Sequence, residues 1–168
     1  MALWLQGAID ERGCQGEGCL TCPYQIFMER ESWACTAEKY WRNYSVASEL
    51  WRLLGQPKKG DRLQGIIGEM DRDEDGVLVM SLPQIEEAIS LLSGLDEALL
   101  EFTGNIHFRF DPQKIDWDLN KYSDLVDHWK NPDGTEVYTL VNSFTRAENI
   151  EYYLKGALRV GKPVEFEY

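Results

Sequence analysis

The sequence predicts one α+β domain over residues 1–168, with a mixed or antiparallel sheet packed against about three to four helices. The chain is long enough to bury one core, because 43% of its 168 residues are hydrophobic. Apolar residues recur at helical spacing in some segments and alternate with polar residues in others, and the two patterns are intermixed. Asp75-Gly76 between two apolar runs indicates a hairpin, which favours antiparallel pairing.

The first third of the chain has the least regular pattern. Residues 2–9 are expected to form a strand, and residues 10–22 form a loop rich in Gly and Cys. The aromatic segment 23–44 has mixed periodicity, so no structure is assigned to it. A helix is expected next, capped by Ser45 and ended by Gly55.

The expected hairpin lies near the centre of the chain. Residues 63–70 and 77–81 have β-type patterns, and the acidic run 71–76 joins them as the turn. The segment 56–60, Gln-Pro-Lys-Lys-Gly, is expected to be a loop before the first strand.

Two helical segments are expected after the hairpin. Ser81 and Gln84 form a capping box with Pro83 near the first helical position. The helix is expected to break at Gly94, after which residues 96–102 continue as helix.

The C-terminal third is expected to contain further short elements. Ile106 to Phe110 alternate in polarity, which predicts a half-buried strand. Leu125 and Trp129 indicate a short amphipathic helix after Ser123. The remaining expected elements are a turn at 131–134, a strand at 137–141, a helix opened by a second capping box at 145–148, and a strand at 164–168.

The formal net charge of −12 is unevenly distributed. Residues 61–100 carry ten acidic residues against two arginines, whereas the first sixty residues are balanced. Direct nucleic-acid binding is not expected, because phosphates require clustered Lys and Arg. A protein partner with a basic surface is favoured instead. The chain lacks a membrane-length apolar stretch, and residues 1–7 lack the basic start of a signal peptide, so no membrane association and a cytoplasmic location are expected.

The four cysteines cluster in a Gly-rich loop over residues 10–35. They are Cys14, Cys19, Cys22 and Cys35. A Cys-x2-Cys pair can chelate one metal ion from a tight loop. The first three spacings resemble those of plant-type ferredoxins, whose fourth cysteine lies further downstream. The sequence leaves two alternatives open: a structural zinc site held by all four cysteines, and ordinary thiols of a reducing compartment.

The acidic run has a second interpretation. Asp71, Asp73, Asp75 and Gly76 resemble the first half of an EF-hand calcium loop. The bidentate glutamate that closes such a loop would fall at Leu82. A solvent-exposed hairpin turn without tight calcium binding is therefore the favoured interpretation.

No catalytic motif accompanies the two histidines. His107 and His128 are far apart in sequence, and no nucleophile motif surrounds either one. We therefore expect surface histidines and a protein that is not an enzyme, and that needs no cofactor. An enzyme whose site is assembled from scattered residues is a further alternative.

The leading functional hypothesis is a small acidic inhibitor that binds a protein. Immunity proteins and small antitoxins are of this type, and they neutralise a basic toxin or enzyme by covering its active site with carboxylates. The hypothesis rests on this likeness of type, since no family motif is matched; an acidic surface that only confers solubility is the competing interpretation. A four-cysteine zinc module for protein recruitment is the alternative function. The predicted contact residues are Asp71, Asp73, Glu74, Asp75, Glu86, Glu87, Trp51 and Trp129.

Overall fold

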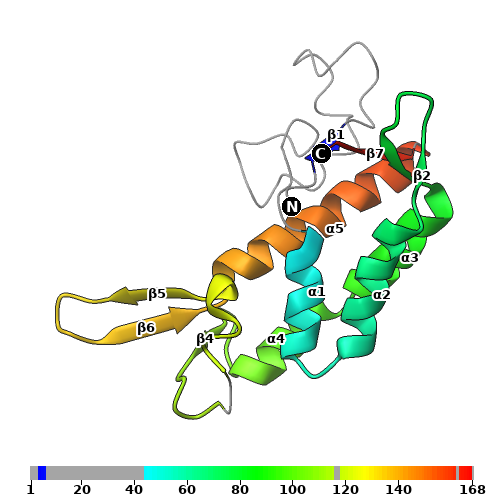
Figure 1. Ribbon diagram of the computed structural model, residues 1–168. Coiled ribbons are helices and arrows are strands. Elements are labelled where there is room, and N and C mark those ends of the chain that lie inside the picture. Colours follow the sequence, from blue (N-terminus) through cyan, green and yellow to red (C-terminus); the bar gives the residue numbers. More distant parts are fainter. Residues whose placement is uncertain (1–3, 7–43, 116–117, 162, 168) are drawn as a thin grey trace.

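The computed structural model describes residues 4–6, 44–115, 118–161 and 163–167. Within these ranges, five α-helices accompany two small antiparallel sheets (Figure 1). The predicted α+β class is confirmed, with one helix that the sequence did not predict. The helices are α1 (Tyr44–Leu53), α2 (Pro57–Gly68), α3 (Leu82–Leu92), α4 (Leu95–Thr103) and α5 (Val141–Val160).

Each sheet is built from antiparallel neighbours. The larger sheet has the strand order β1-β7-β3-β2, and the smaller one has the order β4-β6-β5. Trp4 lies opposite Glu167, so segments from the two ends of the sequence lie side by side. The strands are β1 (Trp4–Gln6), β2 (Asp71–Arg72), β3 (Leu78–Met80), β4 (Arg109–Phe110), β5 (Asp127–Lys130), β6 (Glu136–Thr139) and β7 (Val164–Glu167).

The long helix α5 connects the two sheets, because it follows β6 and precedes β7. Helices α1 and α3 pack against α5, and α2 packs against both of them. In Figure 1 the β5–β6 hairpin projects from one end of the molecule, and the β2–β3 hairpin lies at the other end. The helices therefore separate the two hairpins.

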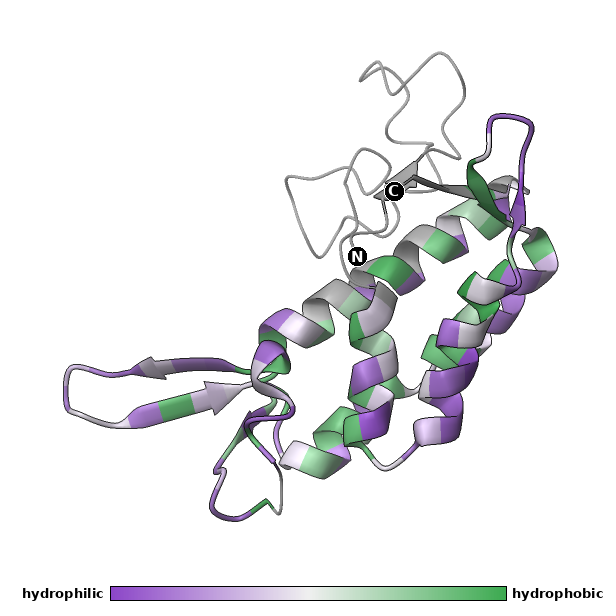
Figure 2. Cartoon of the chain, in the orientation of Figure 1, coloured by the Kyte–Doolittle hydropathy of each residue, from purple (hydrophilic) through white to green (hydrophobic). Residues whose placement is uncertain are grey.

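The core lies between the helices. Figure 2 shows hydrophobic residues on the sides where the helices face one another and hydrophilic residues on the outside. Ile150, Leu154 and Ala157 of α5 are buried, and their spacing of four and three positions places them on one face of the helix. The other large side chains that are fully buried are Leu50, Leu63, Ile66, Met80, Ile85, Leu92, Leu99 and Leu140.

Helix α2 replaces the loop at 56–60 and the strand at 63–70, and both of those predictions are wrong. Pro57 occupies the first turn, where its missing N–H would have no helical partner in any case. At Gly60 an added Cβ would lie only 2.6 Å from the carbonyl oxygen of Ser48 in α1. Glycine disfavours a helix, but here it permits close packing of α1 and α2, and the packing prevails.

The acidic run forms the predicted hairpin turn, although the strand before it is only Asp71–Arg72. The carboxylate Oδ1 of Asp73 accepts hydrogen bonds from the backbone N–H groups of Asp75, at 2.9 Å, and of Val77, at 2.8 Å. Gly76 has a φ of 81°, a left-handed conformation that glycine adopts without steric cost. The turn is therefore fixed by its own residues.

The helices on either side of Gly94 follow the sequence closely. Ser81 and Gln84 form the predicted capping box at the start of α3. Gly94, with a φ of 82°, separates α3 from α4. Helix α1 lies where a helix was predicted and ends two residues before Gly55, but it includes Tyr44, so the prediction that Ser45 caps it is wrong.

Two predictions between residues 106 and 130 are wrong. The expected strand at 106–110 is reduced to Arg109–Phe110, because Phe108 turns the chain with a φ of 49°. Ile106 is 72% exposed instead of half-buried. The expected helix after Ser123 is one 3-10 turn, Ser123–Leu125, and the chain then enters β5.

Helix α5 begins four residues earlier than the predicted capping box at 145–148, which lies inside the helix. The hydroxyl of Ser143 donates a 2.6 Å hydrogen bond to the carbonyl oxygen of Leu125, which attaches the first turn to the preceding 3-10 turn. This tertiary contact has no local signal in the sequence.

Among the described helices, none combines the length and apolar character that a membrane span requires. The predicted cysteine loop and the aromatic segment 23–44 lie outside the described residues.

Candidate functional site

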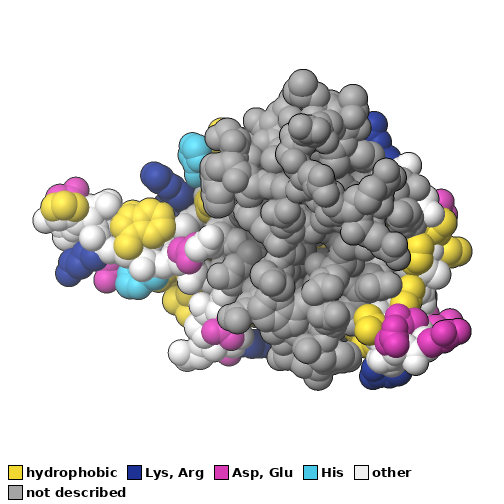
Figure 3. Space-filling view, turned by 90° about the horizontal axis from the view of Figure 1, so that it is seen from above, with side chains coloured by type: hydrophobic (Ala, Val, Ile, Leu, Met, Phe, Trp, Pro, Cys, Tyr) yellow, Lys and Arg dark blue, Asp and Glu magenta, His cyan; other side chains and the backbone are white. Residues whose placement is uncertain are grey.

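Six of the predicted contact residues gather at one end of the molecule, on the β2–β3 hairpin and the first two turns of α3. We call this surface the acidic end; it comprises Asp71, Asp73, Glu74, Asp75, Glu86 and Glu87. Figure 3 shows acidic side chains grouped at this edge, on the opposite side from the projecting arm formed by β5 and β6. The structure therefore places two acidic segments, eleven positions apart in sequence, on neighbouring elements at the same end of the molecule.

Most of the carboxylates at the acidic end face solvent. Asp71, Glu74, Asp75 and Glu86 are exposed, and no ion pair involving them is found among the described residues. Asp73 differs, because its side chain is hydrogen-bonded within the turn. Asp73 therefore supports the shape of the hairpin while its neighbours present charge.

Arg62 of α2 forms hydrogen bonds that hold the elements of the acidic end in place. Its guanidinium donates to Glu69, with an Nη1–Oε1 distance of 2.7 Å, and to Glu87 of α3, with an Nη2–Oε2 distance of 2.9 Å. The side-chain amide of Gln84 also donates to the carbonyl oxygen of Glu69, at 3.2 Å. These bonds connect the end of α2 to the start of α3 and fix the base of the hairpin.

In this network, the arginine and the two carboxylates each stabilise the ionised form of the other. The hydrogen bond from Arg62 lowers the pKa of Glu69, and the same interaction lowers the pKa of Glu87. In turn, the hydrogen bonds with Glu87 and then Glu69 raise the pKa of Arg62. Glu87 is thus ion-paired with Arg62, which it shares with Glu69, whereas no ion pair is found for the exposed Glu86 beside it among the described residues.

The two predicted aromatic contact residues do not join the acidic end. Trp51 is only 2% exposed, and its indole N–H donates a 2.8 Å hydrogen bond to the carbonyl oxygen of Leu91. Lys59 covers the Trp51 ring at 4.2 Å from its centroid. Trp51 therefore belongs to the core. Trp129 is 42% exposed, but it lies on β5 at the other end of the molecule.

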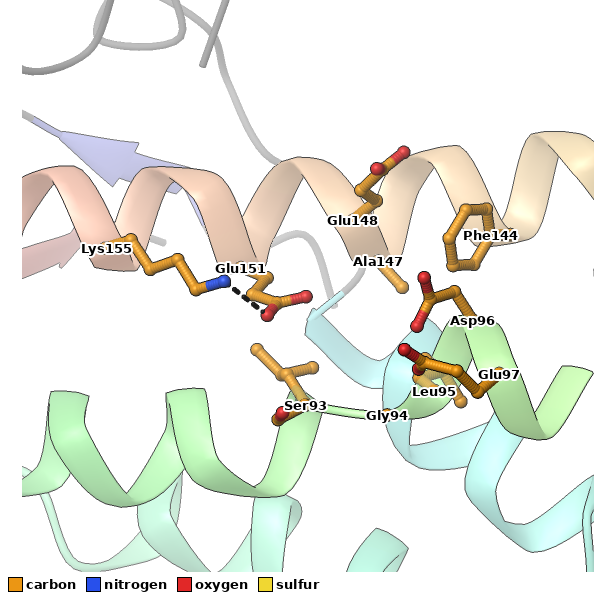
Figure 4. Close-up of a pocket in the computed structure, with 11 residues that line it drawn as sticks. Ser93, Gly94, Leu95, Asp96, Glu97, Phe144, Ala147, Glu148, Glu151 and Lys155 are labelled. Carbon is orange, nitrogen blue, oxygen red and sulfur yellow. Dashed lines mark ion pairs between the residues drawn. The ribbon is translucent and has the colours of Figure 1, made fainter. Parts of the chain in front are cut away.

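A cavity of about 240 Å³ lies between the α3–α4 junction and α5. Its charged and aromatic lining comprises Asp96, Glu97, Phe144, Glu148, Glu151 and Lys155. Figure 4 shows Asp96 and Glu97 of α4 facing α5, where Lys155 forms a 2.8 Å ion pair with Glu151. The hydrogen bond to Asp96 raises the pKa of Glu97, because two carboxyl groups lie close together. A cation is electrostatically favoured in this cavity.

A second cavity, of about 320 Å³, lies on the smaller sheet at the opposite end. We call it the Trp129 hollow; its lining includes His107, Arg109, Asp127, Trp129, Val141 and Asn142. The amide Nδ2 of Asn142 lies 3.4 Å from Oδ1 of Asp127, so these two polar side chains are paired.

The loop that presents His107 and Arg109 is fixed by several hydrogen bonds. Oδ1 of Asn105 accepts from the backbone N–H groups of His107, at 2.9 Å, and of Arg109, at 3.2 Å. Its Nδ2 donates to the carbonyl oxygen of Arg109 at 2.7 Å, and the hydroxyl of Thr139 donates to that of His107 at 3.0 Å. Phe108, whose φ is positive, is buried and packs on Phe144 at a centroid distance of 4.8 Å. A strained backbone is thus held in place by its surroundings.

The two predicted surface histidines are both exposed. His107 lies in the loop just described, and His128 lies on β5, where it stacks on Tyr138 at a centroid distance of 4.3 Å. Nε2 of His128 also lies 3.7 Å from a carboxylate oxygen of Glu136. Ring stacking and one nearby carboxylate account for the position of His128.

Sequence reasoning missed the cavity at the α3–α4 junction and the role of Arg62. A signal for the cavity existed, because Asp96 and Glu97 follow directly after the predicted break at Gly94. Arg62 gave no signal, because its helix was itself interpreted as a strand.

The described residues contain no group of three or more His, Cys, Asp or Glu side chains placed to hold a metal ion. The four cysteines lie outside these residues, so the four-cysteine zinc site stays a prediction. Comparison of the chain with protein-family models, with curated proteins and with solved structures found no match.

Proposed function

We propose that the protein is a binding protein that inhibits a basic protein partner, in the manner of immunity proteins and small antitoxins. The observation that carries this proposal is the acidic end, where the exposed carboxylates of Asp71, Glu74, Asp75 and Glu86 lie on a hairpin and on the helix that directly follows it. The proposal assigns no catalytic role to the chain.

Preorganisation supports the proposal. The Asp73 side chain fixes the turn, and Arg62 fixes the contact between α2 and α3 beneath it. A basic partner would meet carboxylates already held in position, so little conformational freedom would be lost on binding. The contacts of Asp73 and Arg62 lie within the chain and leave the exposed carboxylates available.

Charge also supports the proposal. The net charge of −12 exceeds in magnitude the roughly 2–8 that keeps a small domain soluble. The excess lies in residues 61–100, which include the acidic end and the Asp96–Glu97 pair. Such a field attracts a basic surface over long range and raises the rate of association.

The cavity between α3, α4 and α5 offers a place for one basic side chain of the partner. The close approach of Asp96 and Glu97 is unfavourable when both are ionised, and a lysine or arginine from the partner would relieve it. Lys155 already pairs with Glu151, so the Asp96–Glu97 pair is the part of the cavity that would receive the cation.

Affinity capture from the native host at low ionic strength tests the proposal. The full chain is compared with a variant carrying Asp71→Lys, Glu74→Lys and Asp75→Lys; Asp73 is kept because it holds the turn. The matched control reverses three exposed acidic residues elsewhere, Glu101→Lys, Asp124→Lys and Glu136→Lys.

We expect the native chain and the control to retain the same basic protein, and the acidic-end variant to lose it. The captured protein should lose its activity when the native chain is added. Capture of no specific protein, or equal capture by all three chains, would show that the acidic end is not the binding surface.

The cysteine prediction has a separate test. Metal analysis of protein purified without chelator would give about one zinc per chain if Cys14, Cys19, Cys22 and Cys35 form a site. Four thiols that react with an alkylating reagent in metal-free protein, with stability unchanged by chelator, would rule the zinc site out.

A further inference from the structure

We infer that the Trp129 hollow binds a peptide segment of a partner protein in which an acidic side chain adjoins an aliphatic or aromatic one. The hollow lies at the β4–β6–β5 end, remote from the acidic end (Figure 1). The inference rests on its own residues and is independent of the proposed inhibitory function.

The apolar half of the site is formed by Trp129 and Val141, each 42% exposed. Large apolar side chains exposed to water indicate a binding site more strongly when they line a concave surface than when they are scattered over the protein. Ile106, 72% exposed, is adjacent in sequence to His107 of the same hollow. Three of the exposed large hydrophobic residues in the described ranges thus belong to this end of the molecule.

The charged half of the site is Arg109. Arg52 is ion-paired with Asp61 and Arg62 with Glu69, whereas no described carboxylate pairs with Arg109. An arginine that lines a cavity of a strongly acidic protein without a carboxylate partner has the geometry to receive one from a ligand. Asp127, the acidic residue of the hollow, is instead paired with Asn142.

The site is rigid where the ligand would be recognised. Asn105 and Thr139 hold the backbone of His107 and Arg109 through hydrogen bonds of 2.7–3.2 Å. Phe108 between them keeps a left-handed conformation because its ring is buried against Phe144. A loop held in a sparsely populated conformation beside a cavity is the kind of strain that binding sites retain.

The size and charge of the hollow favour a peptide over a nucleotide or nucleic acid. Its volume of about 320 Å³ is at the lower end of the range for ligand pockets, enough for one or two side chains. It contains a single arginine within a chain of net charge −12, which is a poor match for a phosphate backbone. One cation beside an indole ring matches one carboxylate beside one apolar side chain.

Blocked tetrapeptides test the inference. The full chain is titrated to millimolar concentration with acetyl-Gly-Glu-X-Gly-amide, where X is Leu, Ile, Phe or Trp, and with the matched peptides that carry Lys in place of Glu. Binding is followed by the NMR shifts of the Trp129 indole N–H and of the backbone amides of residues 107–109.

We expect at least one glutamate peptide to shift these resonances saturably, and its lysine counterpart to leave them unchanged. Arg109→Met should weaken binding by about tenfold, and Trp129→Ala should abolish it. Lys114→Met, a cation outside the hollow, should leave the affinity unchanged. Each variant must retain the native NMR spectrum beyond the substituted site.

Three results would overturn the inference: no glutamate peptide shifts the hollow, lysine peptides bind equally well, or Arg109→Met binds as the native chain does. Adenosine monophosphate is included as a competitor. Shifts at the hollow that occur with the nucleotide and with none of the peptides would assign the site to another class of ligand.

Discussion

Arg62 shows how a single residue organises the proposed binding surface. It joins Glu69 at the end of α2 to Glu87 in α3, and both pairs are on the outside of the molecule. A cation within an acidic surface reduces the net field, yet here it positions the elements that carry the unpaired carboxylates. Its role is therefore structural and electrostatic at once.

Replacing Arg62 with Met should remove the interactions that lower the pKa values of Glu69 and Glu87. A carboxylate with a lowered pKa in the folded state stabilises the protein above its unfolded pKa, and this stabilisation is lost as pH falls through the folded value. The variant should thus be less stable than the native chain at neutral pH, with the difference vanishing in acid. Urea unfolding between neutral and acidic pH measures it.

The control for this prediction is Lys114→Met, which removes an exposed cation without breaking an ion pair among the described residues. The electrostatic account would be contradicted if Arg62→Met lowered the free energy of unfolding by the same amount at neutral and at acidic pH.

The same substitution should destabilise the protein at Trp51 and have little effect on its stability at Trp129. Trp51→Phe leaves the carbonyl oxygen of Leu91 without its donor and opens space in the core, so the free energy of unfolding should fall by about 1–3 kcal/mol. Trp129→Phe at an exposed position should change it by less than about 0.5 kcal/mol. Urea denaturation measures both, and equal effects would show that one of the two environments is wrongly described.

At the scale of the elements, the contact between α1 and α2 depends on Gly60. Gly60→Ala would bring a Cβ to 2.6 Å from the backbone oxygen of Ser48, and the two helices would have to separate. We expect a loss of roughly 1–3 kcal/mol in the free energy of unfolding. Thermal or urea unfolding provides the measurement.

Gly65→Ala in the same helix is the matched control. Its nearest added contact would be 3.7 Å, to the Arg62 side chain, so alanine should stabilise α2 by about 0.5–1 kcal/mol through helix propensity. Destabilisation by both substitutions would mean that α2 tolerates no alanine at all, and that the close approach at Gly60 is not the cause.

The elements that the sequence predicted correctly are those with local signals. The capping box at Ser81, the break at Gly94 and the turn at Gly76 each depend on backbone chemistry within four residues. Helix α2 was missed because Pro57 and three glycines lower its intrinsic propensity, and the packing that stabilises it comes from α1 and α3. Tertiary contacts of this kind leave no mark in a local pattern.

At the scale of the whole molecule, the candidate site was only half predictable. The acidic run at 71–75 and the pair at 86–87 were identified from charge alone, and the fold places them on a hairpin and on the helix that follows it, with Arg62 joining Glu87 to Glu69, which lies two positions before the run. Trp51 and Trp129, the two other predicted contact residues, do not lie at this end: Trp51 is buried in the core, and Trp129 lies on β5 at the opposite end of the molecule. Composition identifies charges, but only the fold assigns them to a face.

The two ends of the molecule present different chemistry, which allows their roles to be separated experimentally. The acidic end carries exposed carboxylates on a fixed hairpin, and the Trp129 hollow carries an arginine and exposed apolar side chains. Variants at one end should leave binding at the other unchanged, because the sites share no residues and are separated by the helices.

The most direct test of the proposed function is the rate of association with the captured basic partner, measured by stopped-flow fluorescence over a range of ionic strengths. We predict that the association rate constant of the native chain falls steeply as the salt concentration increases. At low salt, the variant with Asp71→Lys, Glu74→Lys and Asp75→Lys should have an association rate constant at least about tenfold lower than that of the native chain. Its dissociation rate constant should change by a smaller factor. Native and variant chains that associate at the same rate, or a rate that does not depend on salt, would contradict the account.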